Sequence, residues 1–306
     1  MQNVIEVRNL HKTYGGTVAV DDVSFDVEEG EIFGILGPNG AGKTTTVECV
    51  EGLRTAEGGT VSVLGLDPQH DRAELTQVLG VQLQDSQLPA RLEVAEALSL
   101  YSAFYRHPAD WRVLLDTLGL ADKARTPFGK LSGGQKQRLS IALALLGSPR
   151  VAVLDELTTG LDPQARRDTW ELIEGVRDRG VTVVLVTHFM EEAERLCDRV
   201  ALIDAGRVVE VDTPANLAER AGDEQRIQFT PSVPLDDALL TSLPDITNVI
   251  RRGDVVVVTG NGNALNAVTS VLARHQIVAK HLRVDQANLE DAFLKLTGRH
   301  STAEHN

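Results

Sequence analysis

Hydrophobic and polar residues alternate along the first part of the chain, which is the pattern of half-buried β-strands. The alternation covers residues 4–14 (VIEVRNLHKTY) and 18–37 (VAVDDVSFDVEEGEIFGILG), and it returns in residues 58–65 (GGTVSVLG). We therefore predict an N-terminal part that is rich in β structure.

The pattern becomes helical from about Leu92 to Leu146. Three segments there have helical spacing, and Pro108 and Pro127 separate them. The segments read VAEALSLYSAFY, WRVLLDTLGL and QKQRLSIALALLG. This region predicts an α-helical subdomain over about residues 90–147.

Two apolar, β-branched runs follow, VAVLDE (151–156) and VTVVLVTH (181–188). Between them, residues 163–180 (PQARRDTWELIEGVRDRG) have a helical pattern. Strands that alternate with helices form parallel sheets covered on both faces. The sequence thus predicts an α/β fold with a mostly parallel sheet, preceded by an N-terminal antiparallel β subdomain.

The remaining residues predict a second, smaller domain. Residues 201–212 (ALIDAGRVVEVD) predict a hairpin, and residues 213–222 (TPANLAERAG) predict a short helix that closes the first domain. Residues 225–297 are typical of a small α+β unit, in which VVVVTG is the clearest strand. We expect one domain at 1–220, a C-terminal α+β domain at 221–298 and a flexible tail at 299–306.

Four glycines crowd one turn in the stretch GILGPNGAGKTTTVECVEG, residues 34–52. Glycine loses more backbone entropy on folding than any other residue, so the cluster indicates a bound group close to the main chain. The stretch satisfies G-x-x-x-x-G-K-[ST], with a β run before it and a helical pattern through Leu53 after it. In such a P-loop, backbone N–H groups and the lysine bind phosphates, and the hydroxyl after the lysine is placed to bind Mg²⁺. The predicted binding residues are Gly37, Pro38, Asn39, Gly40, Ala41, Gly42, Lys43, Thr44 and Thr45.

The second half of an ATP site should be acidic, and VAVLDE supplies the acidic residues. Asp155 ends the predicted strand, where a carboxylate can hold the Mg²⁺ carried by the nucleotide. Glu156, one residue on, is placed to position and polarise the attacking water. Two adjacent carboxylates are often merely solvated, but a P-loop in the same chain favours the catalytic interpretation.

Composition limits the classes of binding partner and the cellular compartment that we expect for this chain. The net charge is −14 over 306 residues, so the chain gains little from attraction to phosphate backbones or anionic lipid. We expect no nucleic-acid partner. No apolar run reaches the length of a bilayer span, and the N-terminus lacks the layout of a signal peptide, so we expect a cytoplasmic protein. Cys49 and Cys197 resemble no metal-ligand set and are interpreted as reduced packing residues.

At LSGGQKQR, residues 131–138, the sequence resembles the ATP-binding subunits of ABC transporters. This string is the signature motif of that family. The P-loop, VAVLDE, TGLDP (159–163) and His188 stand in the family's order, so the resemblance covers residues 3 to about 220. ANLEDAFLKLTGR, residues 287–299, further resembles the multidrug and antibiotic-resistance ATPases of ABC-2 type exporters, whose membrane subunit is a separate chain.

The resemblance implies roles for further residues. Tyr14 matches the aromatic residue that stacks on adenine, and His188 matches the switch histidine that contacts the γ-phosphate. Gln84 matches the glutamine that reaches Mg²⁺ and the attacking water, near the docking site of the membrane subunit, with Gln82 as the alternative. Asp162 matches the loop along the dimer interface. The signature residues Leu131, Ser132, Gly133, Gly134 and Gln135 lie at a predicted helix start, which favours anion binding.

The family resemblance also implies the mechanism and the partners. Two copies, or this chain and a paired ATPase subunit, face head to tail and hold two ATP molecules between P-loop and signature motif. ATP closes the dimer, hydrolysis reopens it, and a separate integral-membrane permease follows the motion. The chain itself is then peripheral on the inner face of the cell membrane.

One residue departs from the family pattern, because Leu157 follows Glu156 where proline is common. A less constrained backbone between Glu156 and Asp162 is the expected consequence. The alternative function is a non-transport ABC ATPase that acts on nucleic acid or ribosomes. The long coiled-coil insertion or second cassette typical of those proteins is absent from the sequence.

Overall fold

The computed structural model describes residues 2–82, 88–220, 222 and 225–298. The chain divides into two compact units, residues 1–214 and 215–306, and each has a hydrophobic core of its own. The domain boundary at residue 220 stays a prediction.

The first unit contains a three-stranded antiparallel sheet in the order β2-β1-β4. Its strands are β1 (Asn3–Tyr14), β2 (Thr17–Glu28) and β4 (Gly58–Val63). Gly15 and Gly16 join β1 to β2, and both have positive φ, 54° and 88°. Two such residues are what a tight two-residue hairpin turn requires.

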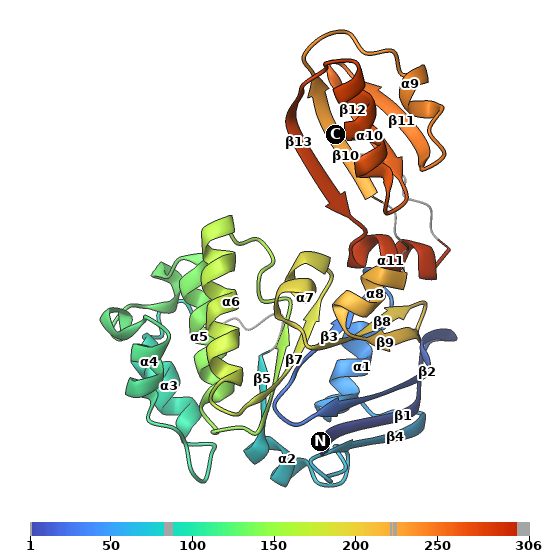
Figure 1. Ribbon diagram of the computed structural model, residues 1–306. Coiled ribbons are helices and arrows are strands. Elements are labelled where there is room, and N and C mark those ends of the chain that lie inside the picture. The colour runs from blue at the N-terminus through green and yellow to red at the C-terminus, as the bar shows by residue number, and fades with distance from the viewer. Residues whose placement is uncertain (1, 83–87, 221, 223–224, 299–306) are drawn as a thin grey trace. The chain divides into compact units, whose positions relative to one another are not determined.

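A six-stranded sheet forms the centre of the first unit, in the order β5-β6-β7-β3-β8-β9 (Figure 1). The first five strands are parallel, and β9 pairs antiparallel at the edge. The strands are β3 (Ile32–Leu36), β5 (Leu79–Gln82), β6 (Val151–Asp155), β7 (Thr182–Thr187), β8 (Arg199–Asp204) and β9 (Arg207–Asp212). Every residue of β3, β6 and β7 is buried, as expected for a parallel sheet with helices on both faces. Their carboxyl ends therefore meet at one edge, where ligands bind in open α/β sheets.

Helices lie against this sheet (Figure 1). They are α1 (Lys43–Val50), α2 (Arg72–Val78), α6 (Pro163–Arg177) and α7 (Met190–Leu196). Helices α1, α6 and α7 follow β3, β6 and β7, and α2 precedes β5. Helix α1 ends at Val50, three residues before the predicted end at Leu53, because Gly52 adopts φ 72°. A side chain there would lie 2.5 Å from the Pro68 carbonyl oxygen.

The predicted helical segment forms three helices and two short 3₁₀ turns. The helices are α3 (Val94–Ser102), α4 (Trp111–Thr117) and α5 (Gly133–Leu145), and the turns are Ala121–Lys123 and Phe128–Lys130. The three helices contact one another pairwise. Their shared apolar side chains, among them Leu98, Leu115 and Leu139, are fully buried.

The second unit begins with α8 (Pro214–Arg220), whose first residue lies at the division. It continues with β10 (Gln225–Pro231), α9 (Ala238–Thr241), β11 (Ile246–Arg252), β12 (Val255–Gly260), α10 (Ala264–Arg274), β13 (Ala279–Gln286) and α11 (Leu289–Leu296). The strands pair antiparallel in the order β11-β12-β10-β13. This is the split β-α-β arrangement, and its core joins Phe229 and Val258 to Val268 and Leu272 of α10.

The α/β fold class is confirmed, with a mostly parallel sheet, an antiparallel sheet beside it, a helical segment and a small α+β unit. The predicted hairpin is present as β8 and β9, which turn at Ala205 and Gly206 with φ 48° and 77°. Cys49 and Cys197 are buried free thiols. Within the described ranges, no helix combines the length and apolarity that a membrane span requires.

Candidate functional site

The P-loop joins the carboxyl end of β3 to the first turn of α1, and two of its glycines are required by the fold. Gly37 has φ 157°, and a Cβ there would lie 2.1 Å from the Ile203 carbonyl oxygen. Gly42 has φ 99°, and a Cβ there would lie 2.4 Å from the Ala19 carbonyl oxygen. Gly40 also has positive φ, 80°, but a Cβ there would meet open space. Close contact with the protein's own backbone therefore explains part of the glycine cluster that the sequence attributes to a ligand.

The other loop residues range from buried to exposed. Lys43 and Ala41 are buried, Pro38 and Thr45 are half-buried, and Asn39 and Thr44 are exposed. The ammonium of Lys43 donates to the carbonyl oxygens of Gly37 and Pro38, at 2.9 and 3.1 Å. Burial lowers the pKa of Lys43, and the carboxylates of Glu156 and Asp155 oppose this effect. The lysine is thus held at the loop, close to the two acidic residues.

Asp155 ends strand β6, with only 7% of its surface exposed. Its Oδ1 is buried and has no hydrogen-bond partner among the described residues. Burial, and next the neighbouring Glu156 carboxylate, raise the pKa of Asp155 to about 6, while Lys43 opposes the shift. An unpartnered buried carboxylate oxygen is costly, so this atom is suited to bind a cation.

Glu156 follows in a strained backbone conformation, with φ 48°. A non-glycine residue in the left-handed region costs of order 1–3 kcal/mol and is concentrated at functional sites. The backbone N–H of Glu156 donates to the Val186 carbonyl of β7 at 2.9 Å, which fixes the turn. The side chain then meets His188, since His188 Nδ1 lies 3.2 Å from Glu156 Oε1. The structure therefore brings together two residues that lie 32 positions apart in the sequence.

The signature segment begins helix α5 with a capping box. Ser132 Oγ accepts from the Gln135 backbone N–H at 3.3 Å, and Gln135 Oε1 accepts from the Ser132 N–H at 3.0 Å. Ser132 and Gly133 are exposed, whereas Leu131 is buried. The predicted helix start is thus present, and its role as an anion site stays a prediction.

The loop before α6 and the first turn of α6 lie against the same helix start. A Cβ on Gly133 would lie 3.8 Å from Leu161 Cδ2, and one on Gly134 would lie 3.6 Å from Ala165 Cβ. Asp162 caps α6 by accepting from the backbone N–H groups of Gln164 and Ala165, at 3.0 and 2.9 Å. The structure thus gives Asp162 a local role as a helix cap, and its interface role stays a prediction.

Leu157 occupies the position where the family commonly has proline, and it is fully buried. Two turn hydrogen bonds hold the backbone after it, from Thr159 N–H to the Glu156 carbonyl and from Leu161 N–H to the Thr158 carbonyl. The packing of Leu157 in the core and these two turns restrict the backbone at a position where the family commonly uses proline for that purpose.

Gln84 lies outside the described residues, so its role stays a prediction. The alternative residue, Gln82, is buried at the end of β5. Its Oε1 accepts from the Asp155 backbone N–H at 2.9 Å. Gln82 therefore holds the strand end that carries the acidic residues, a role that the sequence pattern did not indicate.

Tyr14 ends β1 and is 39% exposed, and two cations lie beside its ring. Lys12 Nζ and Arg54 Cζ are each 5.5 Å from the ring centroid. Sequence reasoning singled out Tyr14 alone. Lys12 stands two residues before it, the spacing at which strand side chains share a face, whereas Arg54 is brought there only by the fold.

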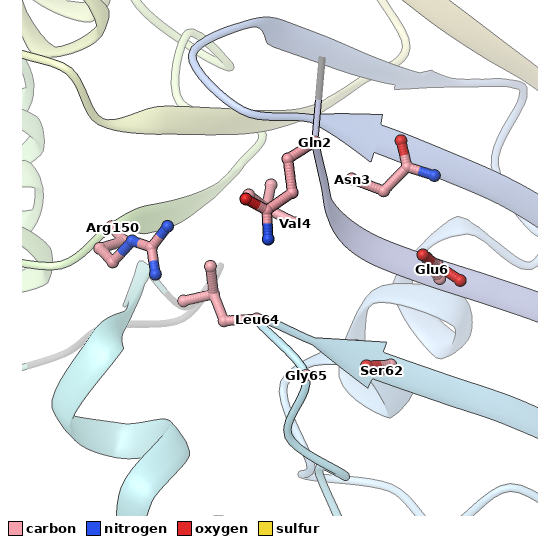
Figure 2. A pocket seen from close by; sticks show the side chains of 8 residues that line it. All are labelled: Gln2, Asn3, Val4, Glu6, Ser62, Leu64, Gly65 and Arg150. Carbon is pink, nitrogen blue, oxygen red and sulfur yellow. The ribbon is translucent and has the colours of Figure 1, made fainter.

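A hollow of about 430 Å³ lies elsewhere in the first unit, along β1 and β4 (Figure 2). Figure 2 shows Arg150 and Leu64 on one side of it, and Gln2, which precedes β1, and Asn3, the first residue of β1, on the other. None of the P-loop, acidic or signature residues lines this hollow. It is therefore separate from the site at the sheet edge.

Comparison with known proteins agrees with the motif order. Residues 20–159 match the protein family described as ABC transporter. The chain is 33% identical to the linearmycin resistance ATP-binding protein LnrL of Bacillus subtilis (strain 168), over 97% of this chain and 99% of that protein. It is 44% identical to the Nod factor export ATP-binding protein I of Burkholderia orbicola (strain AU 1054), over 96% of this chain and 97% of that protein.

Solved structures agree as well. The ATP-binding cassette MJ0796, solved as a dimer in a post-hydrolysis state with ADP and phosphate, is similar with a TM-score of 0.62 and 28% sequence identity. The similarity covers 68% of this chain and 98% of that one.

Proposed function

The chain belongs to the ATP-binding proteins of ABC transporters, which makes it an ATPase, and we propose that its ATP hydrolysis drives export through a separate membrane permease. Export is supported by the names of its relatives, one for Nod factor export and one for resistance to linearmycin. We place the chain in the cytoplasm, on the inner face of the membrane, held there by the permease near Gln84.

One observation carries the catalytic proposal: Lys43, Asp155, Glu156 and His188 meet at the carboxyl edge of the parallel sheet. The carboxylates of Glu156 and Asp155 affect the pKa of Lys43, and Glu156 lies 3.2 Å from His188. A lysine at a P-loop can bind the terminal phosphates of ATP. Glu156 is then placed to orient the attacking water and accept its proton, and His188 holds the carboxylate oxygen in position and lies near the γ-phosphate.

The residues also fit Mg²⁺. Asp155 offers the unpartnered oxygen Oδ1, and Thr44 offers a hydroxyl in the first turn of α1. Mg²⁺ takes hard oxygen ligands and is commonly held by one or two carboxylates together with substrate phosphates. When bound, the ion would neutralise charge that develops on the phosphates.

We propose that the active form is a dimer in which each site is completed by the signature segment of the opposite protomer. The exposed start of α5 at Ser132 and Gly133 supports this, because a capped helix N-terminus attracts anions. The structure of a related cassette as a dimer supports it as well. ATP would close the dimer, and loss of the γ-phosphate would let it open.

The direct test is steady-state ATP hydrolysis by the full chain and by Glu156→Gln. We expect turnover to fall by roughly 10²-fold or more, the scale of a lost general base, with ATP affinity kept. Glu171→Gln, which removes an exposed carboxylate on α6, serves as the control and should keep wild-type turnover. Turnover of Glu156→Gln within a few-fold of wild type would remove Glu156 from this role.

A further inference from the structure

The end of strand β1, which carries Tyr14, is tied to a residue far along the chain. Glu57 accepts three hydrogen bonds from it: Lys12 Nζ to Oε1 at 2.8 Å, and Thr13 N–H and Thr13 Oγ1 to Oε2 at 3.0 and 2.6 Å. The Glu57 backbone N–H also donates to the His11 carbonyl at 2.9 Å. One carboxylate therefore binds the two residues that immediately precede Tyr14.

Along one edge, the end of β1 is paired with β2 as far as Tyr14 and Thr17, but the two residues after Tyr14 offer little further support. Gly15 and Gly16 form the hairpin turn, and a Cβ on either would have no heavy atom within 4 Å. Glycine is the most conformationally free residue, so a Gly-Gly turn does little to fix the direction of an adjacent side chain. Along the other edge, the pairing of β1 with β4 ends at His11 and Gly58. Glu57 lies directly before β4 and extends this connection to the last residues of β1.

The same carboxylate also holds one of the two cations beside the tyrosine ring. It holds the Lys12 ammonium 5.5 Å from the ring centroid, and Glu48 holds Arg54 at the same distance through a 2.7 Å bond to Nε. Cations within about 6 Å of an aromatic face attract it. Hydrogen bonds, of which the one from Lys12 has the largest effect, lower the pKa of Glu57 to about 2. The carboxylate therefore stays ionised at neutral pH.

Building on the function proposed above, we propose that Glu57 is a positioning residue for the nucleobase of ATP. It fixes the end of β1 so that the Tyr14 ring presents a face on which the base stacks. Glu57 acts through Lys12 and Thr13 and does not itself touch the nucleotide. Its contribution should therefore depend on the base and on the tyrosine ring, and not on the phosphates.

The test is a double-mutant cycle read by calorimetry on the full chain, with MgATP and Mg-tripolyphosphate as ligands. Loss of an aromatic stack corresponds to about a tenfold rise in Kd, which we expect for Tyr14→Ala with ATP. Glu57→Ala should raise the Kd for ATP by about threefold, because the ring remains but is less well placed. Neither variant should change the Kd for tripolyphosphate. In the Tyr14→Ala background, Glu57→Ala should have no further effect.

Two further variants keep the test sharp. Thr13→Val removes the 2.6 Å hydroxyl bond at nearly constant volume and should weaken ATP binding in the same direction as Glu57→Ala, but less. Glu29→Ala breaks another exposed ion pair, 2.6 Å from Arg150, and is the matched control, with unchanged affinity for both ligands. If Glu57→Ala folds poorly, Thr13→Val still measures the effect of losing a hydrogen bond to Glu57.

The outcomes separate the possible failures. If Glu57→Ala weakens ATP and tripolyphosphate equally, or adds its full effect to Tyr14→Ala, Glu57 does not act through the ring and the positioning role is wrong. If Tyr14→Ala leaves ATP affinity unchanged, the ring does not bind the base, and the positioning role falls together with the predicted contact between Tyr14 and adenine. Catalysis by Glu156 would be untouched by either result.

Discussion

Glu51 offers a stability prediction, because its carboxyl group is buried. It follows the last residue of α1, is 9% exposed, and stands at a helix C-terminus, where the helix dipole disfavours negative charge. Burial raises its pKa from 4.5 to about 8, and Asp155 and Glu48 add to the shift. Glu51→Gln keeps the shape of the side chain and removes the ionisable group.

The sign and size of the effect follow from linkage. A carboxyl whose pKa is higher in the folded state binds more protons there, so the free energy of unfolding falls as pH rises from the unfolded pKa of 4.5 to the folded value of about 8. At 1.36 kcal/mol per pKa unit, the cost at pH 7 is at most about 3 kcal/mol. Glu51→Gln should remove this cost. The gain should be near zero at pH 4.5 and largest above pH 8.

Urea unfolding followed by tryptophan fluorescence measures this, because both tryptophans, Trp111 and Trp170, lie in the first unit. Curves for wild type and Glu51→Gln at pH 5, 7 and 8.5 should diverge progressively. The control Glu74→Gln, on the exposed face of α2, should track wild type at all three pH values. A gain that does not vary with pH, or a loss at pH 8.5, would refute the linkage argument.

Two further variants address the nucleotide. Lys43→Ala should raise the Kd for ATP by about tenfold or more, because a charge that binds the phosphates is lost. The control is Lys130→Ala, which changes an exposed lysine. Unchanged ATP affinity of Lys43→Ala by calorimetry would count against the P-loop assignment. Ser132→Arg should block ATP-driven dimerisation while ATP binding by the monomer stays nearly unchanged, because the bulky side chain would occupy the anion site at the start of α5. Thr76→Arg, the same change on exposed α2, should dimerise normally, and dimerisation of Ser132→Arg at wild-type ATP concentrations would show that this segment does not face the nucleotide.

Much of the first unit could be predicted from the sequence, because its signals are local. Strands β3, β6 and β7 are continuous apolar runs, and the P-loop pattern fixes a strand before it and a helix after it. The glycine at position 206 marks the hairpin between β8 and β9. The end of α1 was less predictable, because Gly52 acts through a close contact with Pro68.

The support of the site could not be predicted, because it depends on contacts between distant residues. Glu57 reaches Thr13 across 44 positions, through the register of β1 with β4 and its irregularity between Arg8 and His11. Gln82 reaches Asp155 across 73 positions because β5 and β6 are neighbours in the sheet. Neither pairing leaves a pattern in a single sequence, whereas the residues with predicted chemical roles lie in recognisable motifs.

In the proposed mechanism, two copies of the chain enclose ATP, and Glu156 activates the water that hydrolyses it. Sedimentation of Glu156→Gln with MgATP tests both parts, since a dimer that binds ATP but cannot cleave it should accumulate. We predict a mass of twice 33.1 kDa with MgATP and a return to the monomer mass with MgADP. A monomer at saturating MgATP, or a dimer that forms equally with ATP, ADP and no nucleotide, would contradict the account.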